Sequence, residues 1–220
     1  EIYKKEWIDF NKNGKKDIYE DPTQDIEKRI DDLLSQMNLD EKTCQLATYY
    51  GYRKALKDSV PTAEWKTNIL KDGIANVDEH LNKEIGDPNT LATALAETQR
   101  FFVEYTRLGI PADFTNEGIR GLNARSATSF PSMNGLGCTW DKELAYRQGV
   151  IEGREARAMG YTNIYAPILD VARDQRWGRW EGAIGEDPYL VARIGVAMSK
   201  GIQSQRVVST PKHYVGYGDC

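Results

Sequence analysis

A lysine and a histidine stand side by side in the stretch "STPKHYVGYG", directly after the short apolar run "RVV". Lys212 precedes His213, which is one of only two histidines in the 220 residues. Both side chains can donate hydrogen bonds, and imidazole also exchanges a proton near neutral pH. A lone histidine is more often structural, but a Lys-His pair at the end of a strand favours a binding or catalytic role.

Two further charged clusters follow apolar segments. "TNEGIRG" contains Glu117 and Arg120, and "DVARDQRWGRWEG" contains Arg173 together with two tryptophans. Carboxylates and charged donors bind sugar hydroxyls bidentately, while indole stacks on the apolar face of a pyranose, so these residue types suit a sugar. In the alternative interpretation, the arginines of the second cluster only hold their loop together, through ion pairs of Arg173, Arg176 and Arg179 with Asp170, Asp174 and Glu186.

The elements that must position these clusters alternate regularly. The spacing predicts a helix from a Thr90 cap to Gly109, another from an Asp141 cap to Gly160, and a third from Pro188 to Gly201. Strands are predicted after them at 110–114, 163–172 and 206–214. Nearer the front, helices are expected over 23–38 and from an Asp40 cap, with loop and short helix over 49–89. Repeated helix and buried strand indicate a parallel α/β fold, in which working residues gather at the strand ends.

The segment "DFNKNGKKDIYE" fits the twelve-residue calcium loop of EF-hands. Oxygen ligands would come from Asp9, Asn11, Asn13, the backbone carbonyl of Lys15, Asp17 and Glu20. Gly14 permits the sharp turn, although position 8 is Lys16, where such loops usually place an apolar residue. A structural calcium ion is therefore expected, and the alternative is a polar leader without a metal.

The composition of the chain excludes several classes of binding partner. The net charge is −4 and no basic run occurs, so neither nucleic acid nor an anionic membrane surface is an expected partner. Charges interrupt every apolar stretch before the roughly 20 residues that a membrane span needs. The three cysteines, Cys44, Cys138 and Cys220, are odd in number and far apart, which favours neither disulfides nor a zinc site.

Taken in order, seven motifs resemble glycoside hydrolase family 3, the β-glucosidase and β-xylosidase family. They are "NEGIRG", "ATSFP", "TWDKEL", "GREARAMG", "APILDVARDQRWGR", "GEDPYLVARIG" and "TPKHYVGYG". Together they extend over about residues 91–218. The last motif resembles the glucosidase branch, because the N-acetylglucosaminidase branch carries a second histidine there. "GAI" departs from the family pattern before "GEDP".

The resemblance implies a (β/α)8 TIM-like barrel, incomplete within this chain. Residues 1–22 would be a leader with the EF-hand-like loop, and residues 23–220 the N-terminal portion of the barrel domain. Glu117, at a position where the family usually has Asp, would bind the terminal sugar. Arg120, Arg173, Lys212 and His213 match further positions that bind its hydroxyls. The family's nucleophile, an Asp, lies downstream of the position of Cys220, and the general acid generally lies later still.

The implied activity is that of an exo-acting, retaining β-glycosidase, which needs no cofactor for catalysis. It would remove terminal glucose or xylose from a β-linked oligosaccharide. The 220 residues are expected to be an inactive segment of a longer enzyme, completed by the remainder of its own barrel or by another chain. A periplasmic or secreted location is implied. Two alternatives remain open: a non-catalytic carbohydrate-binding remnant and a calcium-dependent interaction module.

Overall fold

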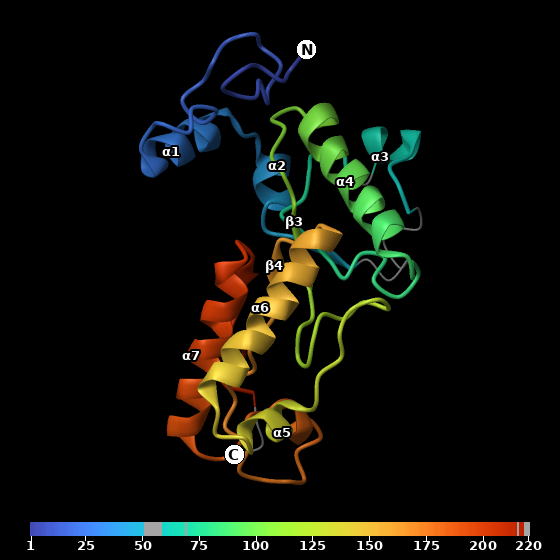
Figure 1. The fold of residues 1–220 in the computed structure, drawn as a ribbon. Coiled ribbons are helices and arrows are strands. Elements are labelled where there is room, and N and C mark those ends of the chain that lie inside the picture. Colours follow the sequence, from blue (N-terminus) through green and yellow to red (C-terminus); the bar gives the residue numbers. More distant parts are fainter. Residues whose placement is uncertain (51–58, 69, 215, 218–220) are drawn as a thin grey trace. The chain divides into compact units, whose positions relative to one another are not determined.

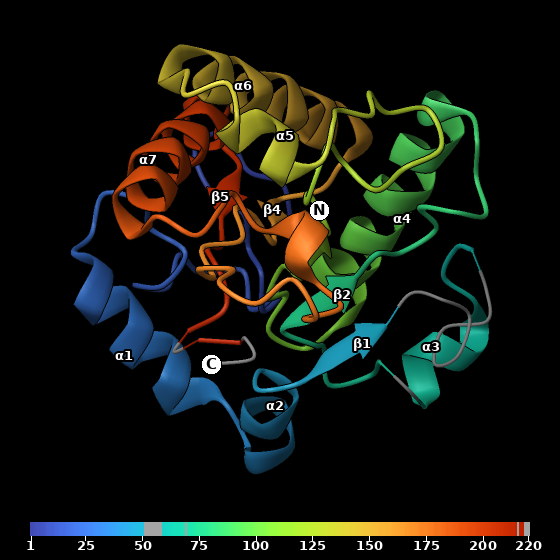
Figure 2. The same cartoon turned by 90° about the horizontal axis from the view of Figure 1, so that it is seen from below.

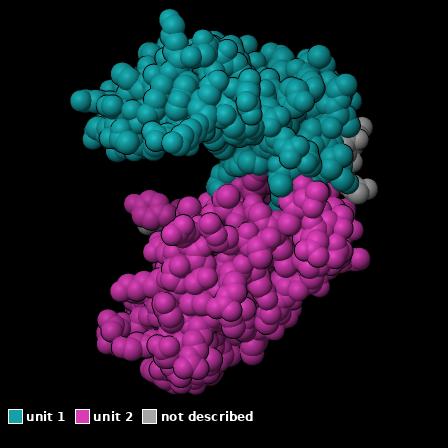
Figure 3. Space-filling view, turned by 45° about the horizontal axis from the view of Figure 1, so that its top comes forward, with its two compact units in different colours: residues 1–77, 94–113 teal, residues 78–93, 114–220 magenta. Residues whose placement is uncertain are grey.

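The computed structural model describes residues 1–50, 59–68, 70–214 and 216–217, which fold into two compact units. Unit 1 comprises residues 1–77 and 94–113, and unit 2 comprises residues 78–93 and 114–220 (Figure 3). The predicted leader, residues 1–22, lies within unit 1. Its boundary as a separate domain remains a prediction.

Unit 1 is mainly helical around an aromatic core. It contains the elements α1 (Ile26–Gln36), α2 (Leu39–Cys44), β1 (Thr48–Tyr50) and α3 (Ala63–Thr67), with the larger parts of β2 (Asn76–Asp78) and α4 (Pro88–Tyr105). The ring centroids of Trp65 and Phe101 lie 5.7 Å apart in an edge-to-face arrangement, and Phe102 is fully buried beside them. Such pairs add to the hydrophobic stabilisation of a core.

The first helices begin where side chains satisfy their free N–H groups. Asp25 accepts hydrogen bonds from the first turn of α1. Asn38 caps α2 by accepting from the N–H of Glu41, whose carboxylate in turn accepts from the N–H of Asn38. The predicted Asp40 cap was therefore wrong by two residues. The predicted Thr90 cap was also wrong, because α4 begins at Pro88.

Unit 2 alternates helix and strand, as the sequence predicted. Its elements are most of β3 (Asp113–Asn116), then α5 (Met133–Gly137), α6 (Lys142–Met159), β4 (Asn163–Ile164), η1 (Trp180–Gly182), α7 (Pro188–Ser204) and β5 (Val208–Ser209). β4 pairs in parallel with both neighbours, Thr115 facing Asn163 and Ile164 facing Ser209. The strand order of the sheet follows the chain, β1-β2-β3-β4-β5. The predicted parallel α/β fold is thus confirmed.

The strands of unit 2 are shorter than predicted. β4 ends at Ile164, and Pro167, which has no N–H to donate, lies just beyond it. Pairing resumes as an isolated parallel bridge between Ile168 and Lys212, in which the Leu169 N–H donates to the Lys212 carbonyl. The chain therefore stays extended on the way to its charged residues.

Helices α6 and α7 lie side by side in both ribbon views, against β4 and β5 (Figures 1 and 2). Glycines allow them to approach backbone to backbone. A Cβ atom on Gly201 would lie 2.2 Å from the Tyr146 carbonyl oxygen, and one on Gly149 would lie 2.3 Å from that of Met198. Neither position has room for a methyl group.

Substitution of Gly201 by alanine is expected to push α6 and α7 apart. Overpacking of this kind lowers the free energy of unfolding by about 1–3 kcal/mol. Urea denaturation followed by circular dichroism would measure it. Gly178→Ala is the matched control, because no atom lies within 4 Å of the added Cβ. Equal midpoints for the two variants would contradict the close contact.

Candidate functional site

The charged residues of unit 2 lie just beyond the carboxyl ends of its strands. Glu117 directly follows β3, Asp170 follows the extension of β4, and Lys212 and His213 follow β5. Because β3, β4 and β5 are parallel, these ends share one edge of the sheet. The predicted sites after the strands therefore belong to one region of the same unit.

Lys212 and Glu117 form a tight ion pair there. The Lys212 Nζ atom lies 2.7 Å from Oε1 and 2.6 Å from Oε2 of Glu117. The lysine side chain is 14% exposed and the glutamate side chain 31%, so the pair is sheltered but open to solvent on one side. Nζ also lies 5.7 Å from the ring centroid of Tyr165. The two charges are held together by segments 95 residues apart in sequence.

His213 is held by Asp170. Its Nδ1 atom lies 2.7 Å from Oδ2 of Asp170, whose side chain is only 3% exposed. The Tyr217 N–H donates to the other oxygen of Asp170 at 2.9 Å. A carboxylate at Nδ1 favours the tautomer with a proton on that nitrogen, which leaves Nε2 available to another partner. The peptide bond between Lys212 and His213 is cis.

Aromatic and cationic groups surround the histidine. The ring of Tyr217 lies 4.7 Å from that of His213 and 5.9 Å from that of Trp177, in edge-to-face arrangements. The guanidinium carbon of Arg179 lies 5.4 Å from the Tyr217 ring centroid. One of the two tryptophans that the sequence suggested for sugar stacking thus lies beside this cluster.

The arginines of the loop after β4 form fewer ion pairs than the ion-pair interpretation predicted. Arg176 does form an ion pair with Asp174, as that interpretation predicted. Asp170, however, binds His213 rather than an arginine. Arg120 and Arg173 are exposed, and their guanidinium groups form no ion pair with any residue that the structure describes. Of the predicted binding residues, the structure brings Glu117, Lys212 and His213 into contacts, and it leaves both arginines free at the surface.

Sequence reasoning missed two acidic residues at the end of β2. Asp78 is 4% exposed and accepts a hydrogen bond from Thr115 Oγ1 at 2.6 Å. Burial raises the pKa of Asp78 above its ordinary value, and the nearby charge of Glu117 raises it further, while Thr115 and Lys212 lower it. Burial likewise raises the pKa of Glu79. The signal was the run "NVDEH", a short strand followed by charged residues within the segment assigned to loop.

The calcium-like loop is closed by its own hydrogen bonds. Asp9 and Glu20 are both buried, and Asp9 accepts from the N–H groups of Asn13 and Gly14. Glu20 accepts from the N–H groups of Phe10, Asn11 and Asp17. Within the described ranges, no three His, Cys, Asp or Glu side chains come together as metal ligands. The loop has the predicted oxygen-rich composition, and its calcium remains a prediction.

Comparison with known proteins decides the family. The family model of the glycosyl hydrolase family 3 N-terminal domain matches residues 38–220. This chain belongs to glycosyl hydrolase family 3. The resemblance inferred from the seven motifs is therefore confirmed.

Three similar proteins show what share of a relative's length this chain matches. It is 31% identical to a periplasmic β-glucosidase/β-xylosidase of Dickeya chrysanthemi, over 96% of this chain and 35% of that protein. A β-glucosidase structure from Erythrobacter marinus superposes with a TM-score of 0.79, 28% identity, and coverage of 90% and 27%. A mutant β-glucosidase from Listeria innocua in complex with laminaribiose superposes with a TM-score of 0.70 at 26% identity. The match covers 87% of this chain and 27% of that protein. The chain thus spans about a quarter to a third of their length.

The family 3 chain carries no helix long and apolar enough to cross a membrane, among the residues that the structure describes. Cys44 and Cys138 are free thiols, and Cys220 lies outside the described residues.

Proposed function

We propose that this chain provides sugar-binding residues of an exo-acting, retaining β-glycosidase that releases terminal glucose or xylose. The observation that carries the proposal is the Lys212–Glu117 pair at the end of two parallel strands, in a chain of this family. Relatives named as β-glucosidase/β-xylosidase and a relative bound to laminaribiose support the substrate class. The sugar would lie over the open side of this pair.

The pair suits two neighbouring hydroxyl groups. The Glu117 carboxylate accepts hydrogen bonds only, and the Lys212 ammonium donates them only. A vicinal diol can donate a hydrogen bond to the Glu117 carboxylate and accept one from the Lys212 ammonium. Both charges therefore keep a polar partner when the sugar replaces water. His213 Nε2 would bind a further hydroxyl, oriented by the Asp170 carboxylate. Asp78 offers one more carboxyl group to the same sugar.

Double displacement needs two carboxyl groups about 5–5.5 Å apart, one as nucleophile and one as acid and base. Glu117 is poorly suited to attack, because both of its oxygens face the Lys212 ammonium. We therefore assign the nucleophile and the acid to parts of the protein outside this chain. The same additional length would complete the (β/α)8 barrel. A periplasmic or secreted location follows the named location of the Dickeya relative.

The proposal is tested on the full-length gene product with aryl β-glucoside and β-xyloside substrates. Hydrolysis should release a sugar whose β configuration is retained at first, as proton NMR recorded within the first turnovers would show. An initial α product would contradict double displacement. Sugar binding without any hydrolysis would instead favour a non-catalytic carbohydrate-binding protein.

A structural calcium ion in the 9–20 loop is a separate proposal. It is supported by the complete oxygen donor pattern and by Gly14 at φ +79°, where a side chain would be strained. The loop is already anchored in unit 1, because Lys12 Nζ donates to the Val103 and Thr106 carbonyls near the end of α4. Calcium would stabilise this anchorage rather than take part in catalysis.

Calcium should raise the melting temperature of the full-length protein, and EGTA should reverse the shift. At a calcium concentration 100-fold above Kd the stabilisation would be about 2.7 kcal/mol. Asn13 and Gly14 donate their N–H groups to different oxygens of Asp9, so Asp9→Asn keeps an acceptor for only one of them. It also removes the ligand's charge, so it should lose most of the calcium-dependent shift. Identical melting curves with calcium and with EGTA would remove the proposal.

A further inference from the structure

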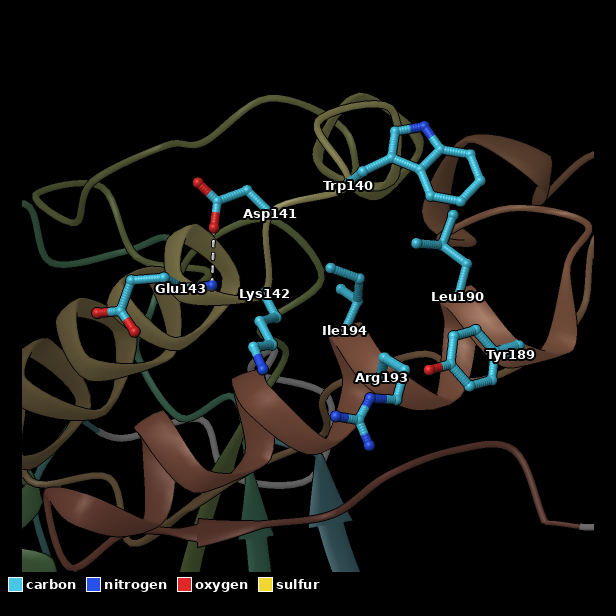
Figure 4. A pocket seen from close by; sticks show the side chains of 8 residues that line it. All are labelled: Trp140, Asp141, Lys142, Glu143, Tyr189, Leu190, Arg193 and Ile194. Atoms are coloured by element: carbon cyan, nitrogen blue, oxygen red, sulfur yellow. Dashed lines mark hydrogen bonds between the residues drawn. The ribbon is translucent and has the colours of Figure 1, made fainter.

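Unit 2 has a pocket outside the strand-end cluster, between the N-terminal ends of α6 and α7 (Figure 4). Its volume is about 490 Å³, within the range of small-ligand sites. Figure 4 shows Trp140 and Tyr189 on two sides of this pocket, with Leu190 between them and Ile194 to one side. Nothing in the proposed catalytic role uses these side chains.

The two aromatic side chains are unusually exposed. Trp140 is 70% and Tyr189 71% accessible to solvent. They come from different elements, the turn before α6 and the first turn of α7, so their proximity depends on the packed helix pair. Large aromatic side chains that border an open pocket present flat apolar faces to a ligand at little cost in side-chain entropy.

Trp140 also has a strained backbone. Its φ is +56°, in the left-handed region that glycine and asparagine adopt most easily. A non-glycine residue in such a conformation costs of order 1–3 kcal/mol, and such residues cluster at ligand sites. An exposed tryptophan contributes nothing to a core that would offset this cost. The left-handed conformation belongs to the turn that follows α5, in which the Trp140 N–H donates to the Gly137 carbonyl, and it leaves the indole exposed beside the pocket.

Charged groups at the pocket balance one another. Lys142 and Arg193 offer donors. Asp141 caps α6 through Oδ1, and Glu143 Oε1 lies 3.5 Å from Arg147 Nε, which leaves the second oxygen of each carboxylate as an acceptor. Neither Lys142 nor Arg193 forms an ion pair in the described part of the chain, so both remain able to bind a ligand. The balance disfavours an anion or a cation as ligand. An uncharged molecule with apolar faces and many hydroxyl groups matches the pocket best.

We propose that this pocket is a second carbohydrate-binding site, which holds a neutral segment of a β-linked polysaccharide. Only the choice of polysaccharide rests on the proposed function. Helices of a parallel α/β unit run opposite to its strands, so the start of α6 and α7 lies at the same end as Glu117 and Lys212. Binding here would keep a chain near the cleavage site and raise its effective concentration there.

Affinity electrophoresis of the full-length protein tests this site, with mixed-linkage β-glucan or arabinoxylan cast into native gels. At least one polysaccharide should retard the wild type. Trp140→Ala and Tyr189→Ala should each weaken retention, roughly tenfold in dissociation constant from the loss of one stacked ring. Their kcat/KM on a small aryl glycoside should stay within about twofold of wild type, because neither residue belongs to the strand-end cluster proposed to bind that sugar.

Tyr105→Ala is the matched control, since this tyrosine is 57% exposed in unit 1, outside the pocket. It should retain wild-type retardation, and so should Lys212→Met, which disables only the proposed catalytic end. Unchanged retention in the Trp140→Ala/Tyr189→Ala double variant would overturn the proposal, as would loss of retention in Lys212→Met. Retardation without any glycosidase activity would refute the proposed function and leave this site standing.

Discussion

Replacing Lys212 with methionine should lower kcat/KM of the full-length enzyme by about 10²–10³-fold, the size of the loss when one donor that stabilises a transition state is removed. Methionine keeps most of the stem of the side chain but cannot donate to a hydroxyl. Glu117 would also lose its counter-charge, so part of the loss should appear as weaker binding. Steady-state kinetics on an aryl β-glucoside or β-xyloside would measure both terms.

The double variant Lys212→Met/Glu117→Gln separates binding from stability. The single variant leaves a sheltered carboxylate uncompensated, which should lower the melting temperature; removing that charge as well should restore it. Activity should not recover. Lys200→Met, at an exposed position on α7, serves as the control and should match the wild type. A Lys212→Met enzyme with normal kinetics would rule out the assigned role.

Replacing Glu152 with glutamine should stabilise the protein, increasingly so as the pH rises from about 4.5 to 8. Glu152 lies on α6 and is completely buried, and its Oε1 atom accepts from Gln148 Nε2 at 2.9 Å. Oε2 has no hydrogen-bond partner among the described residues, and it lies 3.5 Å from the Cβ that a side chain at Gly118 would have. Burial raises the pKa of this carboxyl to about 8, and Glu155 adds repulsion, while Gln148 and the Gly121 backbone act in the opposite direction.

The direction in which stability changes with pH follows from the number of protons that the folded and unfolded states bind. Between pH 4.5 and about 8 the unfolded chain has lost the Glu152 proton, whereas the folded protein retains it. Stability therefore falls by about 1.4 kcal/mol per pH unit over this range and stays level on either side of it. Glutamine cannot ionise and escapes the loss.

Urea denaturation of wild type and Glu152→Gln at pH 5 and pH 8 gives the comparison. The stability difference in favour of glutamine should be larger at pH 8 by about 3–4 kcal/mol. Glu143→Gln, at an exposed position on the same helix, should show no such change. A difference that is equal at the two pH values would mean that Glu152 is ionised in the folded protein.

Local patterns predicted the helices of unit 2 and the order of its strands well, but not where the strands end. Asp141 caps α6, and Gly160 ends it in a left-handed conformation, as their residue types suggest. The charged residues after three strands were predicted from spacing because parallel strands bring their ends together. The ordered motifs then predicted the family, which the family model confirmed.

What failed was the pairing of individual side chains. Nothing in the spacing distinguishes an Asp170 bound to His213 from one bound to an arginine, because that choice depends on the path of the loop between them. β2 was overlooked because three residues are too few for a period-2 pattern. A buried Glu152 was equally invisible, since a charged residue on a helix is normally assigned to its solvent face.

The close contact of α6 and α7 at Gly149 and Gly201 determines which segments of unit 2 can tolerate substitution. Two helices that touch through their backbones form a tightly packed layer against β4 and β5, the strands that lead toward Asp170 and Lys212. Part of the loop beyond β4 is less restricted, because a Cβ on Gly178 would meet nothing within 4 Å. A new sugar preference should therefore be engineered by exchanging the segments after β4 and β5. Redesign of α6 and α7 should mainly destabilise the folded protein.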